Sequence, residues 1–120
     1  MGRKYENGYR KLIAWQEAKA LTLKIYAITK QFPSEEKFGM TSQMRRASSS
    51  TMANLAEGSA MTSKAHRSSF YERARGSAVE VDNFVELAFN LAYITEEECD
   101  DLCDHAARVS YLITQMIKSS

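Results

Sequence analysis

The stretch FYERARGSAVEVDNFVELAFNL, residues 70–91, decides the fold of this chain. Apolar and small residues recur in it at spacings that alternate between four and three, and a second such line runs beside the first. Alternating spacings of three and four place side chains on one face of an α-helix. Two adjacent lines predict a long helix that contacts more than one neighbour. The first line is Phe70, Ala74, Ser77, Val81, Phe84, Ala88 and Leu91, and the second is Tyr71, Ala78, Val85 and Ala92.

The first and last parts of the chain have the same helical period. Residues 12–32 predict one helix, which Pro33 ends because the residue before a proline is disfavoured in the α conformation. Another helix is expected from Thr95, whose side chain can cap its amides while Glu98 reaches back to complete a capping box. The apolar positions are Leu12, Trp15, Ala18, Leu21, Ile25, Ile28 and Phe32 in the first helix, and Leu102, Ala106, Val109, Ile113 and Met116 in the last.

The remaining segment, from Met40 to about Ala60, has an unusual composition on its inner face. Small residues replace large aliphatic ones there, which favours close approach of a neighbouring helix, with hydroxyl groups bonded back to the preceding turn. A serine-rich loop is the alternative. The turn before this segment, Pro33-Ser34-Glu35-Glu36, predicts a cap at Ser34. The expected inner face is Ala47, Ser48, Thr51, Leu55 and Gly58.

These four segments predict an all-α protein, an antiparallel up-down four-helix bundle, because short connections join antiparallel neighbours. A length of 120 residues suits a single domain over 1–120, with residues 1–10 expected to form a disordered arm. No apolar stretch approaches the roughly 18 residues that cross a bilayer. We therefore expect a cytoplasmic protein without a membrane segment.

Charge is distributed unevenly along the chain although the net charge is only +1. Residues 1–75 carry a net charge of +8, whereas residues 76–120 carry −7. Such polarity favours electrostatic pairing within the bundle, between subunits, or between the basic part and an anionic partner. The sequence does not choose among the three.

Motifs for catalysis or metal binding do not emerge from the sequence. It has no glycine-rich phosphate loop, no recognisable nucleophile motif and no Glu-x-x-His pair of the kind that di-metal bundles use. Cys99 and Cys103 share a helical face, but His105 is rotated by about 200° from Cys103. We expect reduced thiols, and no catalytic site, metal or cofactor. An enzyme would need titratable groups that converge in a pocket.

One polar ridge stands out in the segment from Met40 to Ala60. Its residues follow helical spacing and share a face, so they predict either a network that joins helices or subunits, or part of a binding surface. In the structural interpretation, Glu57 accepts a charge-assisted bond from Arg46 or Arg75. The polar ridge comprises Gln43, Arg46, Ser50, Asn54 and Glu57.

In the functional interpretation, basic residues in and beyond this ridge contact nucleic-acid phosphates, which gives salt-dependent and largely sequence-independent affinity. An exposed stripe of arginines would favour binding, and pairing with acidic residues would favour a structural role. The proposed contacts are Arg45, Arg46, Lys64, Arg67, Arg73 and Arg75.

Several motifs, in this order, resemble a known family. They are Leu12-x-x-Trp15-Gln16-x-Ala18, Ile25-Tyr26, Phe32-Pro33, Lys37-Phe38-Gly39-Met40-Thr41-Ser42-Gln43-Met44-Arg45-Arg46-Ala47, Asn54-Leu55-Ala56-Glu57-Gly58 and Ala74-Arg75-Gly76-Ser77. Together they cover most of residues 12–94 and resemble the bacterial four-helix-bundle proteins that are encoded in intervening sequences of 23S ribosomal RNA genes.

This resemblance implies an antiparallel four-helix bundle that assembles into a ring-like homopentamer. It also implies, as a hypothesis, association with RNA or DNA. Related bundles are accessory proteins of reverse transcriptases in diversity-generating retroelements, so such an enzyme is the alternative partner. The chain departs from the family pattern at Met52, where proline is common, and at Ser59-Ala60-Met61, where a glycine or arginine often follows the Glu-Gly pair. The missing arginine weakens the implied phosphate binding.

Overall fold

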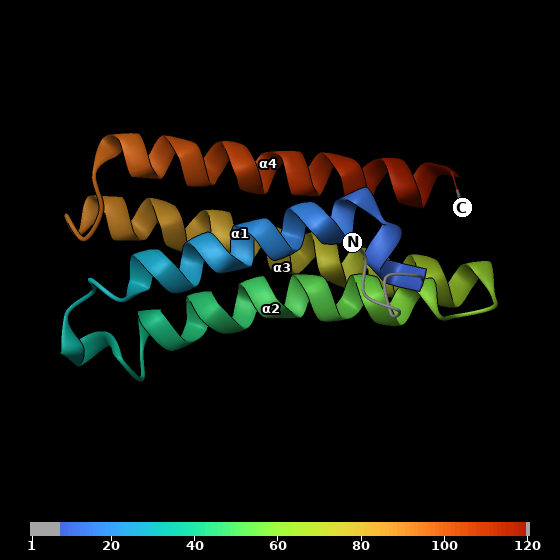
Figure 1. Ribbon diagram of the computed structural model, residues 1–120, viewed down its shortest axis with the longest axis horizontal. Coiled ribbons are helices and arrows are strands. Elements are labelled where there is room, and N and C mark those ends of the chain that lie inside the picture. The colour runs from blue at the N-terminus through green and yellow to red at the C-terminus, as the bar shows by residue number, and fades with distance from the viewer. Residues whose placement is uncertain (1–7, 120) are drawn as a thin grey trace, which may run out of the picture.

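The computed structural model describes residues 8–119, which form a four-helix bundle with no strand in that range. Consecutive helices run in opposite directions, each packs against its neighbours in sequence, and α1 closes the bundle against α4 (Figure 1). The all-α fold is therefore confirmed. The helices are α1 (Ile13–Thr29), α2 (Met40–Ser59), α3 (Lys64–Asn90) and α4 (Glu96–Ser119), with short 3₁₀ helices η1 (Gly8–Lys11) and η2 (Ser34–Glu36).

The N-terminal arm expected over residues 1–10 lies mainly outside the described residues. Its last three residues belong to η1, where the Tyr9 ring contacts Trp15 edge-on at 5.1 Å between centroids. The Arg10 guanidinium lies 4.5 Å from the centroid of Tyr9. In the described range, no helix is long and apolar enough to cross a membrane.

The inner face of α2 is rich in small residues, as predicted, and all five expected positions are buried, together with Met40 and Met44. Its hydroxyl groups are satisfied within the helix. Ser48 Oγ donates to the Arg45 carbonyl at 3.1 Å, and Thr51 Oγ1 donates to the Ala47 carbonyl at 3.0 Å. These bonds remove the penalty of burying a polar group, so the face packs as if it were apolar.

The buried face of α3 runs between the two predicted lines of residues. Phe84 and Ser77 from the first line are only half-buried, and the helix ends at Asn90, before Leu91 and Ala92. Ala92 has a φ of 63°, and Tyr93 N–H donates back to the Ala88 carbonyl at 2.9 Å. Because α3 packs against both α2 and α4, the centre of its inner face lies between the two lines. Its buried residues are Tyr71, Ala74, Ala78, Val81, Val85 and Ala88.

One end of the bundle is joined by Glu36 rather than by the expected cap at Ser34. The Glu36 carboxylate accepts the first amide of α2, Met40 N–H, at 3.0 Å and the Tyr93 hydroxyl at 2.9 Å. This hydrogen bond with Glu36 raises the pKa of Tyr93. The carboxylate thus caps α2 and connects the α1–α2 and α3–α4 turns.

The capping box at the start of α4 is confirmed. Glu98 N–H donates to Thr95 Oγ1 at 3.1 Å, and Thr95 N–H donates to Glu98 Oε1 at 2.9 Å. We expect Thr95→Ala to lower the free energy of unfolding by about 1 kcal/mol, because an amide of the first turn loses its acceptor. Chemical denaturation measures this change. Thr95→Ser, which keeps the hydroxyl, should retain most of the stability, and equal losses in both variants would contradict the capping role.

Candidate nucleic-acid interface

The polar ridge of α2 lies along the edge of that helix that meets α3. At its centre, Asn54 Nδ2 donates to Ser50 Oγ at 3.1 Å and to the Ser50 carbonyl at 3.0 Å. Ser77 Oγ from α3 donates to Ser50 Oγ at 3.1 Å. The middle of the ridge therefore links two helices, as the structural interpretation requires.

The ends of the ridge are exposed to solvent. Arg46 donates a hydrogen bond to Gln43 within α2, and its side chain is exposed. Glu57 is also exposed, and among the described residues it is not bonded to Arg46 or to Arg75. The expected arginine–Glu57 bond is thus absent within residues 8–119 of one chain.

Arg45, the first of the basic positions, is half-buried and has partners within the chain. Its Nε donates to Thr29 Oγ1 at 2.9 Å and its Nη2 donates to the Tyr26 carbonyl at 3.3 Å. The guanidinium also lies 4.7 Å from the centroid of the Tyr26 ring. These contacts join the end of α1 to the start of α2, so Arg45 is oriented by the fold.

Arg67 and Arg75 also have partners within the chain. Arg67 Nη1 donates to the Met61 and Thr62 carbonyls, at 3.3 and 3.0 Å, and so satisfies the turn after α2. Arg75 donates to Thr114 of α4 at 2.9 Å and pairs with Glu72 one turn earlier on α3. Arg67 thus connects the start of α3 to the α2–α3 turn, and Arg75 connects α3 to α4.

The remaining three basic side chains, Arg46, Lys64 and Arg73, are exposed. Arg73 covers the Phe70 ring at 4.8 Å and lies one turn before Ser77, on the helical face that meets the ridge. Lys64 is rotated by about 180° from Arg73, since nine residues separate them. The six predicted contacts therefore do not form one stripe, and only Arg46 and Arg73 flank the Ser50–Ser77 contact.

The spacing of these two arginines follows from helix geometry. Arg46 lies one turn before Ser50, and Arg73 lies one turn before Ser77 on the antiparallel helix α3 (Figure 1). Four residues of an α-helix span about 6 Å, and Arg46 and Arg73 lie on opposite sides of the Ser50–Ser77 contact. The two arginines are therefore about 12 Å apart along the bundle axis. We call Arg46, Ser50, Asn54, Arg73 and Ser77 the α2–α3 surface.

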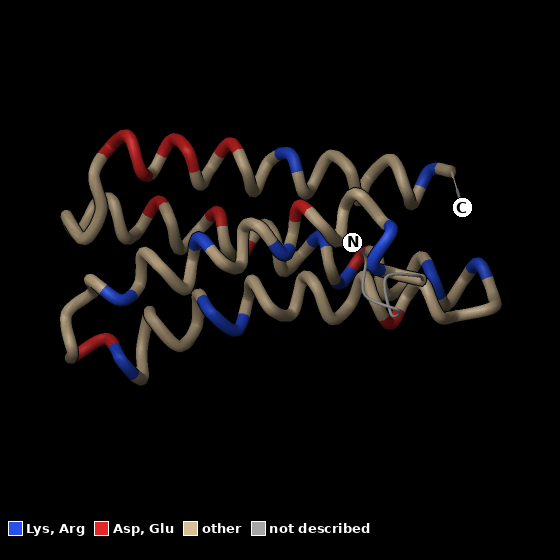
Figure 2. The backbone as a smooth tube through the Cα atoms, viewed as in Figure 1, with Lys and Arg blue, Asp and Glu red and all other residues tan. Residues whose placement is uncertain are grey.

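Most acidic residues occupy a different part of the molecule. They gather on the C-terminal half of α3 and the N-terminal half of α4, whereas basic residues are spread over α1, α2 and the start of α3 (Figure 2). Lys24 pairs with Asp101 between α1 and α4 at 3.0 Å, and Arg108 Nε lies 3.6 Å from Glu17. The acidic residues of this region of the chain are Glu80, Asp82, Glu86, Glu96, Glu97, Glu98, Asp100, Asp101 and Asp104.

The groove between α1 and α4 has a volume of about 330 Å³ and contains three titratable groups, Lys24, Glu98 and Asp101. Lys24 is paired with Asp101, and Glu98 accepts the Thr95 amide in the capping box. The charged groups of this groove thus have structural partners, and they do not converge as an acid–base pair would.

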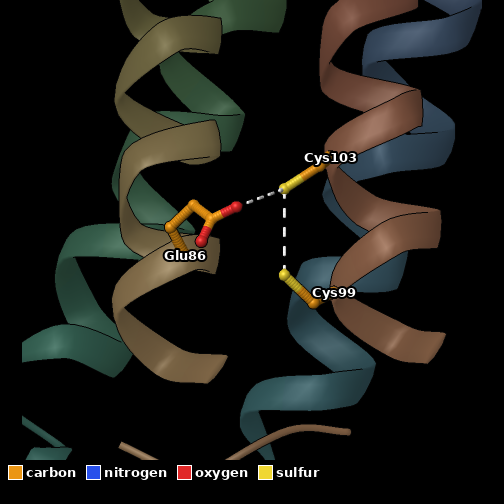
Figure 3. Close-up of side chains that lie close together, drawn as sticks. All are labelled: Glu86, Cys99 and Cys103. Carbon is orange, nitrogen blue, oxygen red and sulfur yellow. Dashed lines mark hydrogen bonds between the residues drawn. The ribbon is translucent and has the colours of Figure 1, made fainter. Parts of the chain in front are cut away.

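A second group of side chains, Glu86 of α3 with Cys99 and Cys103 of α4, lies between these two helices. We call it the thiol cluster. Cys99 Sγ and Cys103 Sγ are 4.0 Å apart, and Cys103 Sγ is 4.0 Å from Glu86 Oε1 (Figure 3). Burial raises the pKa of the Cys103 thiol, and the negative charge of Asp82 raises it further. His105 faces elsewhere, with Nε2 3.0 Å from Glu17 Oε1. The two thiols and the Glu86 carboxylate are donor types that bind metals, whereas no metal site was predicted from the sequence.

Glu86 was not predicted, because the third ligand considered with the two cysteines was His105 on the same helix. A signal was available on the preceding helix. Asp82 and Glu86 are four residues apart, as are Cys99 and Cys103, so each pair shares one helical face. Two such pairs on helices joined by a short turn can meet.

Both the sequence and the fold resemble those of known proteins. The sequence profile described as "23S rRNA-intervening sequence protein" matches residues 10–115. A crystal structure of a protein of unknown function from the S23 ribosomal protein family of Bacteroides thetaiotaomicron superposes with a TM-score of 0.81. It is 24% identical, and the match covers 88% of this chain and 96% of that one. None of the curated proteins matches the chain.

Proposed function

Because the chain belongs to the family of 23S rRNA-intervening sequence proteins, we propose that it is a non-enzymatic, homo-oligomeric scaffold that associates with RNA. The single observation that carries this proposal is the α2–α3 surface. There, Arg46 and Arg73 are exposed on either side of the Ser50–Ser77 contact, whereas three of the other basic positions are held by partners within the chain.

The chemistry of this surface suits a phosphate backbone. A guanidinium group presents a planar fork of N–H donors that can bind a phosphate through two parallel hydrogen bonds. Arg73 is oriented by the Phe70 ring and Arg46 by Gln43, so both donate from defined positions. Contacts to phosphates carry no sequence information, so we expect binding that depends on charge and spacing rather than on base sequence.

Exposed apolar side chains support the homo-oligomeric part of the proposal. Phe38, in the turn before α2, is 88% exposed, and large apolar side chains on α1, α3 and α4 are also open to solvent. A pentameric ring would cover part of this surface and repeat the α2–α3 surface around its circumference. Repetition would multiply phosphate contacts on one RNA strand. The exposed set includes Ile13, Leu23, Tyr26, Phe38, Val79, Leu87, Leu91 and Tyr111.

RNA binding by the purified protein, measured across a salt series with a labelled single-stranded RNA, tests the proposal. We expect the logarithm of affinity to fall linearly with the logarithm of salt concentration. Arg46→Ala combined with Arg73→Ala should weaken binding to all RNA sequences and reduce the slope by about 0.7 for each phosphate that is no longer neutralised. Light scattering on the same samples gives the oligomeric mass.

A matched control removes two exposed positive charges elsewhere. Lys30 lies after α1 and Lys118 near the end of α4, both outside the α2–α3 surface. Lys30→Ala with Lys118→Ala should leave the salt slope near that of the unaltered protein. If both double variants lose affinity equally, only the overall charge matters and the assigned surface is wrong.

A structural assembly module without RNA binding is the alternative, favoured by the partners that Arg45, Arg67 and Arg75 find within the chain. A defined oligomer that fails to bind RNA even at low salt would establish this alternative. The proposed surface would also serve an accessory subunit of a reverse transcriptase, because the RNA template of that enzyme presents the same phosphates.

A further inference from the structure

The thiol cluster brings two kinds of metal ligand together across two helices. Cys99 is buried and Cys103 is half-buried on α4, while Glu86 extends from α3 toward them (Figure 3). One ligand atom from each of these three residues lies within 4.8 Å of the others. This set of two thiols and one carboxylate differs chemically from a surface cluster that contains only carboxylates.

The separations between these atoms are close to those in a tetrahedral zinc site. With Zn–S bonds of about 2.3 Å and Zn–O bonds of about 2.0 Å, tetrahedral angles place two sulfurs about 3.8 Å apart and sulfur and oxygen about 3.5 Å apart. The corresponding distances here are 4.0 Å for Cys99 Sγ to Cys103 Sγ and 4.0 Å for Cys103 Sγ to Glu86 Oε1. The third pair, Cys99 Sγ and a Glu86 oxygen, lies within 4.8 Å, so inward shifts of up to about 1 Å would close the site.

The surrounding charges favour a cation at this position. Burial raises the pKa of the Cys99 thiol, and the carboxylates of Glu86, Asp100 and Asp82 raise it further. The same negative potential that opposes a bare thiolate attracts a divalent ion. Asp82, four residues before Glu86 on α3, adds a second negative charge on the same helical face.

We propose that Cys99, Cys103 and Glu86 bind one Zn²⁺ ion between α3 and α4, with a water molecule as the fourth ligand. Thiolate ligands select zinc over magnesium and calcium, which take oxygen ligands. On binding, each thiol releases one proton and two sulfur–zinc bonds form, with no change of oxidation state. The ion joins α3 to α4, whereas the α2–α3 surface lies where α3 meets α2, so this site is separate from RNA binding.

Titration of the full-length, metal-free protein with Co²⁺ under reducing conditions tests the site. We expect one equivalent to bind, with thiolate-to-cobalt charge-transfer absorption and tetrahedral d–d bands, and we expect Zn²⁺ to displace it. Calorimetry with Zn²⁺ gives the affinity. Zinc should also raise the melting temperature, because the ion binds the folded chain.

Single substitutions identify the ligands. Cys103→Ser should abolish most of the charge-transfer band, and Glu86→Gln should weaken Zn²⁺ binding at least about tenfold while retaining the band. Glu80→Gln removes the same charge from another face of α3 and should bind like the unaltered protein. Circular dichroism without metal checks that each variant folds, and Glu86→Gln, at an exposed position, keeps the test valid if Cys103→Ser does not fold.

Two results would overturn the proposal. The first is an unaltered protein that shows no thiolate–cobalt absorption at millimolar Co²⁺. The second is a Glu86→Gln variant with full zinc affinity, which would remove Glu86 from the site and leave the cysteine pair on one helix without its proposed partner on α3.

Discussion

Replacing Leu55 by alanine is expected to lower the free energy of unfolding by about 2–5 kcal/mol. Leu55 is fully buried in α2, where most other inward side chains are small. Truncation removes apolar contacts and leaves a cavity that the neighbouring small residues cannot fill. Denaturant unfolding at one fixed protein concentration measures the change, because self-association would make stability concentration-dependent.

Leu23 provides the matched control on α1, since its side chain is 61% exposed. Leu23→Ala makes the same chemical change and should alter the stability by no more than about 0.5 kcal/mol at a protein concentration where the chain is monomeric, because Leu23 belongs to the exposed apolar set. Comparable losses in both variants would contradict the position of the core. A small loss at Leu55 alone would mean that α2 relaxes into the space.

Replacement by alanine is expected to change the stability in opposite directions at two glycines, Gly58 and Gly76. A Cβ atom on Gly58 would lie 2.7 Å from Tyr71 Cε1 and 3.0 Å from Phe70 Cβ. Tyr71 is only 5% exposed, so its ring has little room to move. Gly58→Ala should therefore destabilise the protein by about 1–3 kcal/mol despite the better helix propensity of alanine.

Gly76 lies in the middle of α3, and a Cβ atom there would meet no atom within 4 Å. Gly76→Ala should therefore stabilise the protein by up to about 1 kcal/mol, because alanine loses less conformational freedom in a helix. Melting temperatures and denaturant midpoints of the two variants provide the comparison. A stabilised Gly58→Ala variant would show that the α2–α3 contact is looser than described.

Local patterns sufficed to predict the helices and one packing surface. The proline after Phe32 and the capping box of Thr95 and Glu98 mark helix ends through interactions between residues close in sequence. The small inner face of α2 was also predictable, because hydroxyl groups that bond to their own helix need no partner elsewhere. In each case the determining interaction spans only a few residues.

Features that depend on distant residues could not be predicted in the same way. Arg75 finds Thr114, 39 residues away, and Arg45 finds Thr29, so two arginines expected to reach nucleic acid have partners in other helices. Long side chains have many conformers, and only tertiary structure selects one. The two lines of α3 and its contact with two neighbours were predicted, but not that Ser77 and Phe84 lie at the edge of the buried face, because that edge is set by how α2 and α4 share the face. Glu86 was missed because it approaches the cysteines from another helix.

The hydroxyl groups of α2 have a consequence for how that helix is fixed along its axis. Since Ser48 and Thr51 bond to their own backbone, a translation of α2 past α3 would break none of those bonds. Resistance to such sliding comes instead from features specific to one register. The Ser50–Ser77 contact is one, and the fit of Tyr71 against Gly58, two turns further along α2, is the other. The axial alignment of the two helices is thus set in large part by one hydroxyl contact and one absent methyl group.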